Sequence, residues 1–157
     1  MTDWLASLEA TAFASWLRES STIWAYPMVL TLHTSGLALL VGANWLLDLR
    51  LLGAWPSLPI AALEKSFKVM WIGFWINTIS GAMLFAADAT TKGSTRLFLG
   101  KLVLVAFGVL LILLIKRRVF GDNLPTPATS GVAKALAATS IAVWIVAIAA
   151  GRLMAYL

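Results

Sequence analysis

Long apolar runs separated by short polar stretches make up most of the sequence. The four longest runs cover about residues 23–47, 67–87, 97–115 and 132–156. Each is close to or above the ~20 apolar residues with which a helix crosses the ~30 Å hydrocarbon core of a bilayer. The connections at residues 55–59 and 121–127 contain proline or glycine, which end helices. Because short connections make neighbouring helices antiparallel, the pattern predicts a single all-α domain over residues 1–157, an integral membrane four-helix up-down bundle.

The first 22 residues have a different pattern, without a long apolar run. Their charged residues are Asp3, Glu9, Arg18 and Glu19. Because a basic start and a continuous apolar core are missing, no cleavable signal peptide is expected. Apolar side chains recur near helical spacing at Trp4, Leu5, Leu8, Ala12, Trp16 and Leu17. We therefore predict a short amphipathic helix at the membrane interface or, as the alternative, a helix packed on a partner protein.

The composition of the chain also points to lipid. It is 61% hydrophobic and 12% charged, whereas a soluble domain has about 25% charged residues. This leaves too little polar surface for a soluble globule, so a lipid bilayer is the expected surrounding. The absence of cysteine excludes disulfides, iron–sulfur clusters and thiolate metal sites. Ser80 and Ser140 are isolated hydroxyls within spans, and no catalytic residue can be assigned, which leaves open whether the chain is an enzyme.

The net charge of +5 comes largely from basic residues in the connections, which is typical of membrane orientation and not of nucleic-acid binding. The first and third connections and their flanks hold Arg50, Lys65, Lys68, Lys116, Arg117, Arg118 and Lys134. The opposite side holds Arg18, Lys92 and Arg96, with Lys101 and Arg152 just inside their spans. Because lysine and arginine are enriched in cytoplasmic loops, we predict a multi-pass protein of the bacterial inner (plasma) membrane with both termini periplasmic.

Polar side chains follow one face of the first span. With 100° per residue, Asn44 lies about 20° and Asp48 about 60° around the helix from His33. Polar groups are costly in hydrocarbon unless they have partners, so this face is expected to point into the bundle. Gly36 and Gly42 would allow the close approach of a neighbouring helix or of a flat ligand.

His33 is the only histidine of the chain and the main candidate for chemistry. Its imidazole could be an axial ligand of haem iron, relay protons, or hydrogen-bond across two helices. Since one histidine excludes bis-histidine ligation within a chain, the sixth ligand would be Met83, Met154, a water or a group of another subunit. Asn77, in the second span, could contact such a ligand at mid-membrane.

Two basic residues extend this candidate site. With periplasmic termini, His33, Lys101 and Arg152 would lie at a similar depth on three helices. A porphyrin with its ring near His33 and its propionates near Lys101 and Arg152 suits that arrangement, as do a quinone headgroup and an anionic lipid. The alternative is that both side chains only reach lipid phosphates. Asp48 and Arg50 are expected to cap the end of the first span and to pair with the basic connections.

Five short motifs are Tyr26-Pro27-x5-His33-x2-Gly36, Leu47-Asp48-Leu49-Arg50, Ser80-Gly81-x3-Phe85, Lys101-Leu102 and Gly151-Arg152-x2-Ala155-Tyr156. Together they resemble an uncharacterised bacterial family of four-helix integral membrane proteins. More distantly, the order of His33, Arg50-Leu51 and Lys101-Leu102 is similar to that in protoporphyrinogen IX oxidases of the HemJ type and in the copper-resistance protein D domain. This resemblance implies haem binding. It does not carry porphyrinogen oxidation over, because Ile115 precedes the basic cluster where those relatives often have histidine or asparagine.

The leading hypothesis is a small membrane protein that binds haem b for electron transfer or haem handling, with His33 as the metal ligand. The predicted cofactor contacts are His33, Gly36, Gly42, Asn77, Met83, Lys101 and Arg152. The alternative is a non-enzymatic membrane subunit or assembly factor of a larger complex. The expected protein partner is another membrane protein or a further copy of the chain. A transporter of copper or a small solute is less favoured, because no span holds a Met-x-x-Met pair.

Overall fold

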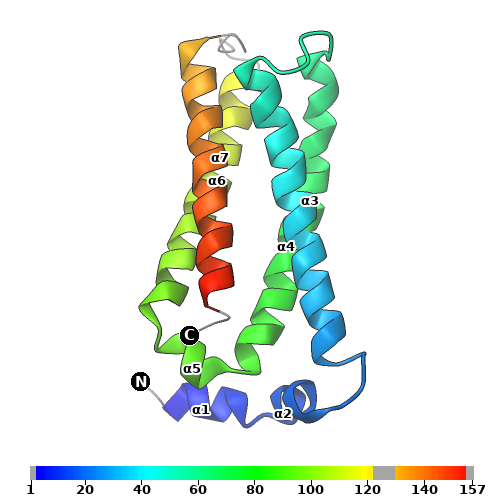
Figure 1. Cartoon of the computed structure of the whole chain (residues 1–157), viewed down its shortest axis with the longest axis vertical. Helices are drawn as coiled ribbons and strands as arrows, with labels where there is room; N and C mark the ends of the chain where they lie inside the picture. Colours follow the sequence, from blue (N-terminus) through cyan, green and yellow to red (C-terminus); the bar gives the residue numbers. More distant parts are fainter. Residues whose placement is uncertain (1–2, 122–129, 155–157) are drawn as a thin grey trace. The chain divides into compact units, whose positions relative to one another are not determined.

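The computed structural model describes residues 3–121 and 130–154 and shows a helical chain (Figure 1). The elements of these residues are α1 (Asp3–Glu9), α2 (Ala12–Glu19), α3 (Tyr26–Leu52), the 3₁₀-helix η1 (Ile60–Lys65), α4 (Ser66–Ala86), α5 (Ala89–Gly93), α6 (Arg96–Phe120) and α7 (Gly131–Leu153). No strand occurs among the described residues, so the all-α prediction is confirmed. Residues 1–2, 122–127 and 155–156, which the predicted segments included, lie outside the described residues.

Four helical segments are long and apolar enough to cross a membrane. They are Tyr26–Leu52, Ile60–Ala86, Arg96–Phe120 and Gly131–Leu153, and each overlaps most of one predicted run. Exposed apolar side chains follow one stripe of α4 at helical spacing, at Ile72, Trp75 and Ile79. Side chains of this kind are stable on a helix surface when lipid covers them. These features indicate a multi-pass membrane protein in a lipid bilayer.

Helix α3 ends later than its apolar run suggests. Gly53 adopts a positive φ of 113° directly after the helix, a conformation that glycine adopts readily. The Gly53 amide donates to the Arg50 carbonyl and the Ala54 amide to the Leu49 carbonyl, which is the Schellman arrangement of a helix end. The helix therefore continues a full turn beyond Asp48, so this residue lies within α3 and not at its end.

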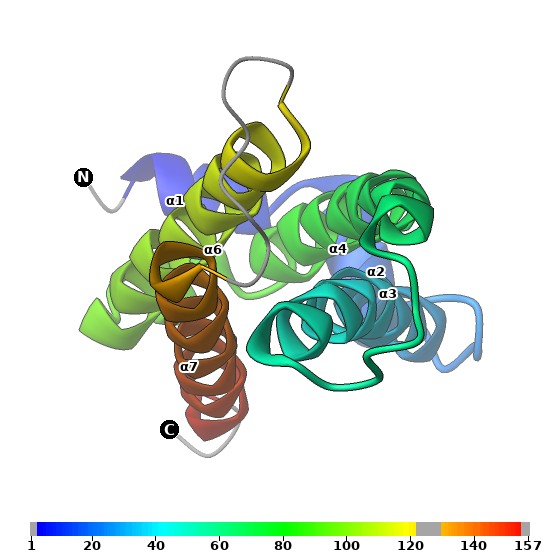
Figure 2. The same ribbon diagram turned by 90° about the horizontal axis from the view of Figure 1, so that it is seen from above.

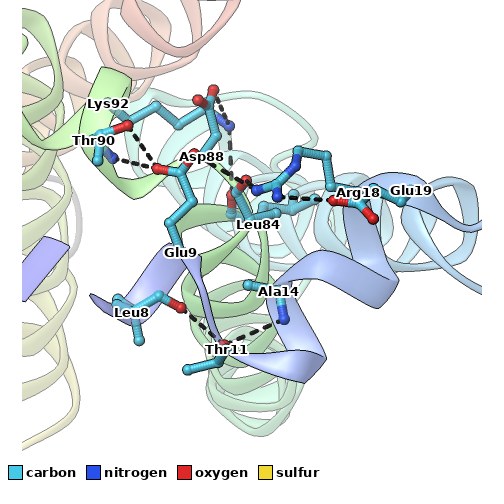
Figure 3. A network of polar contacts seen from close by, with 11 residues as sticks. Leu8, Glu9, Thr11, Ala14, Arg18, Glu19, Leu84, Asp88, Thr90 and Lys92 are labelled. Atoms are coloured by element: carbon cyan, nitrogen blue, oxygen red, sulfur yellow. Dashed lines mark hydrogen bonds and ion pairs between the residues drawn. The ribbon is translucent and has the colours of Figure 1, made fainter. Parts of the chain in front are cut away.

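The predicted N-terminal amphipathic segment is present as two short helices. Thr11 separates α1 from α2, because its hydroxyl donates to the Leu8 carbonyl and accepts from the Ala14 amide at the start of α2 (Figure 3). Both helices are amphipathic, since Leu5 and Leu17 are buried while the charged side chains of Asp3, Arg18 and Glu19 are exposed.

The chain divides into two compact units. Unit 1 comprises Met1–Leu40 and Trp71–Arg96, and unit 2 comprises Val41–Met70 and Leu97–Leu157. Helices α3 and α4 therefore contribute residues to both units. Each unit has its own packing and its own polar groups.

Unit 1 is held together by close contact between α3 and α4, which run side by side in Figures 1 and 2. A Cβ atom placed on Gly36 would lie 2.6 Å from the Asn77 amide nitrogen, and one placed on Gly73 would lie 2.6 Å from the Leu40 nitrogen. Only glycine allows the two backbones this separation. At the end of this helix pair, α2 adds Leu17 to a buried apolar cluster whose other members are Ala25, Val29, Leu84 and Ala87.

Unit 2 contains α6 and α7, which lie side by side in both views (Figures 1 and 2). The fully buried Trp144 of α7 packs on Gly108 of α6, where an added Cβ would meet the indole at 2.8 Å. Phe67 and Phe120 pack edge to face with ring centroids 5.4 Å apart. These aromatic contacts join α6 to α7 and to the start of α4.

Candidate functional site

The imidazole of His33 lies in the contact between α3 and α4. Its Nδ1 is 3.0 Å from the backbone oxygen of Asn77 and 3.3 Å from the Ser80 hydroxyl. The Asn77 side-chain amide donates in turn to the His33 carbonyl over 2.8 Å. The ring also lies against Gly81, where an added Cβ would be 2.9 Å from Cε1. Two neighbouring turns of α4 thus fix the position of the ring.

The hydrogen bonds of His33 depend on which ring nitrogen carries the proton. With the proton on Nδ1, the ring donates to the Asn77 carbonyl, which only accepts hydrogen bonds. With the proton on Nε2, Nδ1 instead accepts from the Asn77 side-chain amide nitrogen, 3.3 Å away. The Ser80 hydroxyl donates to the Ile76 carbonyl and can therefore accept from the same Nδ1–H. In the tautomer with the proton on Nδ1, which has the shortest of these contacts, the lone pair is on Nε2. This nitrogen is the one able to accept a hydrogen bond or bind a metal.

The other residues of unit 1 that were predicted to contact a cofactor have different surroundings. Asn77 is bonded to His33, as described. Gly36 faces the α4 backbone, so the space beside it is filled by a helix. Met83 is half-buried and packs against the apolar cluster around Leu17.

The remaining residues that were predicted to contact a cofactor belong to unit 2. Gly42 is exposed, and no atom of the described residues lies within 4 Å of the position its Cβ would take. Lys101 of α6 crosses to α7, because its Nζ is 3.5 Å from the Cβ position of Gly151. Arg152 follows directly in the sequence and is exposed. Lys101 therefore lies close to the backbone that carries Arg152.

A second polar group lies in unit 2, and the sequence-based interpretation of its members was wrong. Asp48 was expected to cap a helix end and pair with basic connections, and Ser140 was expected to be isolated. Both are fully buried, and Asn44 links them. Its amide nitrogen donates to Asp48 Oδ2 over 2.6 Å and to Ser140 Oγ over 2.8 Å. The four-residue spacing of Asn44 and Asp48 was the available signal, because residues at that spacing are neighbours on a helix surface.

A third polar group ties the N-terminal helices to the α4–α5 end of unit 1 (Figure 3). The Glu9 carboxylate accepts hydrogen bonds from the Thr90 hydroxyl and amide, at 2.6 and 2.9 Å. Arg18 pairs with Glu9 and Glu19 and donates to the Ala87 carbonyl. Lys92 of α5 pairs with Asp88, the residue just before this helix. The network fixes α1 and α2 against α5.

An open cavity of about 340 Å³ lies beside this network, lined by Arg18, Tyr26, Ala87, Asp88 and Lys92. Both cationic side chains of the lining have carboxylate partners. Arg18 pairs with Glu9 and Glu19, and Lys92 pairs with Asp88. The cavity thus offers balanced charges, which suits a small neutral or zwitterionic polar group better than a free anion.

The contact between Glu9 and Thr90 should be sensitive to acid. The hydrogen bonds from Thr90, together with the charge of Arg18, lower the pKa of Glu9, while desolvation opposes them. A carboxyl group whose pKa falls on folding contributes stability above its unfolded value of about 4.3, and this contribution is lost as the pH falls through the lowered pKa. We expect the contact of α1 with α5 to weaken as the pH falls through this lowered pKa.

A spin label can report this weakening, because the chain has no cysteine of its own. With a nitroxide on Ala6→Cys, label mobility should rise steeply as the pH falls. Glu9→Gln should remove most of this pH dependence, whereas the matched change Glu19→Gln, at an exposed carboxylate, should keep it. Equal behaviour of the two variants would show that Glu9 does not control the contact.

Comparisons of the chain with protein-family models, with curated proteins and with solved structures gave no match. The family resemblance drawn from the motifs around His33 and Lys101 therefore stays a prediction.

Proposed function

We propose that the chain is a small multi-pass protein of the bacterial plasma membrane that binds b-type haem, with His33 Nε2 as an iron ligand. The observation that supports this most directly is the hydrogen bond between His33 Nδ1 and the Asn77 carbonyl. Metal-bound histidines almost always donate their second ring nitrogen to a carbonyl, a carboxylate or water, which fixes the tautomer and makes the ligand nitrogen more basic. The donor chemistry of His33 thus fits haem iron.

The surroundings of His33 would tune such a ligand. Asn77 and Ser80 hold the ring by its Nδ1 side, and Gly81 lets it lie against the backbone of α4. Haem, when bound, would supply one-electron chemistry or be the cargo of a haem-handling protein. A second axial ligand from Met83 or Met154, propionate contacts from Lys101 and Arg152, and periplasmic termini remain predictions of the sequence.

The absorption spectrum of the detergent-purified protein, expressed with ample haem, tests this proposal. We expect a Soret band, with α and β bands after reduction by dithionite. His33→Gly should lose these bands and regain them with added imidazole, which can fill the vacated ligand position. Thr34→Ala is a matched control, because Thr34 is exposed and its hydroxyl bonds only within α3, to Leu30. A colourless wild-type protein that is folded by circular dichroism would overturn the proposal.

The contacts of His33 also favour a second candidate function, a non-enzymatic subunit or assembly factor. Asn77 and His33 bond to each other in both directions, so the histidine could serve only to lock α3 to α4. In that case the purified protein is colourless, and His33→Ala lowers the stability of the helix pair. A variant of the exposed Trp16 in α2 would instead abolish co-purification of a membrane partner.

A further inference from the structure

The buried polar group of unit 2 is centred on the side-chain amide of Asn44. Asn44 and Asp48 come from α3 and Ser140 from α7, and all three are fully buried. An amide nitrogen has two hydrogens, and Asn44 uses both of them, one toward Asp48 Oδ2 and one toward Ser140 Oγ. Asn44 therefore has no side-chain N–H left to donate to another acceptor.

Two oxygen atoms of this group have unmet hydrogen-bonding capacity. Within residues 3–121 and 130–154, neither Asn44 Oδ1 nor Asp48 Oδ1 has a hydrogen-bond partner, although both are buried. An unsatisfied buried acceptor is costly, and an unneutralised carboxylate in a membrane span is more so. Both atoms accept hydrogen bonds or bind cations. What they lack is thus a positive charge or a proton.

No charged side chain among the described residues of unit 2 pairs with Asp48. The hydrogen-bond partner found for Asp48 on its own helix is Asn44, and none of the ion pairs among the described residues includes Asp48. Arg50 donates instead to the carbonyls of Leu58 and Pro56. On α6, Lys116 lies over the ring of Phe67, and its neighbours Arg117 and Arg118 are exposed, as is Lys134 on α7. The carboxyl group is thus left to an external cation.

We propose that Asn44, Asp48 and Ser140 form a binding site for one small monovalent cation, a proton or a sodium ion. Both are hard cations that oxygen atoms bind, and the site offers a carboxylate, an amide oxygen and a hydroxyl. The bound cation would neutralise Asp48 within the span and join α3 to α7. The site is independent of His33 and of haem.

Infrared difference spectroscopy of the purified protein at neutral pH tests this site. Spectra of wild type minus Asp48→Asn, in choline chloride, should show the C=O stretch of a protonated carboxyl group. If sodium chloride of equal ionic strength replaces this band by carboxylate bands in a saturable way, sodium competes for the site. If sodium has no effect and the band disappears only as the pH rises, the ligand is the proton alone. A carboxylate signal insensitive to both sodium and pH would overturn the proposal.

Ser140→Ala keeps the carboxyl group and separates binding from folding. Removing this oxygen should weaken the apparent sodium affinity, or the equivalent proton affinity, by about tenfold. Thr139→Ala is the matched control at the neighbouring, exposed position and should leave the titration unchanged. If Asp48→Asn does not fold, wild-type difference spectra between sodium and choline, and between two pH values, give the same readout. Equal titrations of the Ser140 and Thr139 variants would contradict the assignment of Ser140 as a ligand.

Discussion

Replacement of Trp144 by alanine is expected to lower the free energy of unfolding by about 3–5 kcal/mol, the range for removal of a buried aromatic side chain. Trp144 has 0% exposure, and its ring fills the space above Gly108. Alanine would leave a cavity between α6 and α7 that these helices cannot close without moving their backbones. The indole nitrogen lacks a hydrogen-bond partner among the described residues, so its removal also relieves a small penalty. The loss should therefore lie toward the lower end of that range.

Equilibrium unfolding in mixed detergent micelles, followed by circular dichroism, measures this loss. The matched control is Trp75→Ala, since Trp75 is 57% exposed on the apolar stripe of α4, and it should cost about 0.5 kcal/mol or less. Trp144→Phe keeps most of the ring but not the unpaired nitrogen, so its loss should be much smaller than that of Trp144→Ala. Similar losses for Trp144→Ala and Trp75→Ala would contradict the packing described for unit 2.

Two glycine-to-alanine changes in α3 should have opposite effects. Gly36→Ala should destabilise the protein by about 1–3 kcal/mol, the usual cost of overpacking. The added methyl group would lie 2.6 Å from the Asn77 nitrogen and 2.9 Å from the Gly73 oxygen, and backbone atoms cannot move aside as a flexible side chain can. Separation of the helices should also break the hydrogen bond of His33 to Asn77. Any haem spectrum that depends on His33 should then weaken in this variant.

Gly42→Ala is the internal control for this experiment. No described atom lies within 4 Å of the added methyl group, so only helix propensity changes, which favours alanine by about 1 kcal/mol. Thermal unfolding of both variants gives the comparison directly. If Gly36→Ala were as stable as Gly42→Ala, α3 and α4 would not have the close contact described for unit 1.

The spans could be predicted from the sequence because crossing a bilayer imposes a length and a composition on each helix. The end of α3 was harder to locate, since Asp48 and Arg50 resemble a polar boundary. The Schellman turn at Gly53 fixes the end four residues beyond Asp48, and glycine was the local signal for it. In the N-terminal segment, the break at Thr11 was also encoded locally, because threonine is a favoured N-cap, the residue just before a helix.

The contacts between helices could not be predicted from the sequence. The pattern placed His33 and Asn44 on one polar face, yet these two residues bond to different helices, α4 and α7. The choice of partner depends on the rotation and register of each helix, which hydropathy does not specify. For the same reason Ser140 was judged isolated, although it completes the group around Asp48. Gly36 was expected to face either a helix or a flat ligand, and only the structure identified α4 as its neighbour.

The anchoring of α1 and α2 has a consequence for the order of events during synthesis. Glu9 bonds to Thr90 and Arg18 to Ala87, so the two amphipathic helices depend on contacts with residues made much later. Until α4 and α5 have been made, the two amphipathic helices lack these partners, and Trp16 and their other exposed apolar side chains are available to the membrane surface. The N-terminal segment therefore takes its final position only after the second span has entered the bilayer.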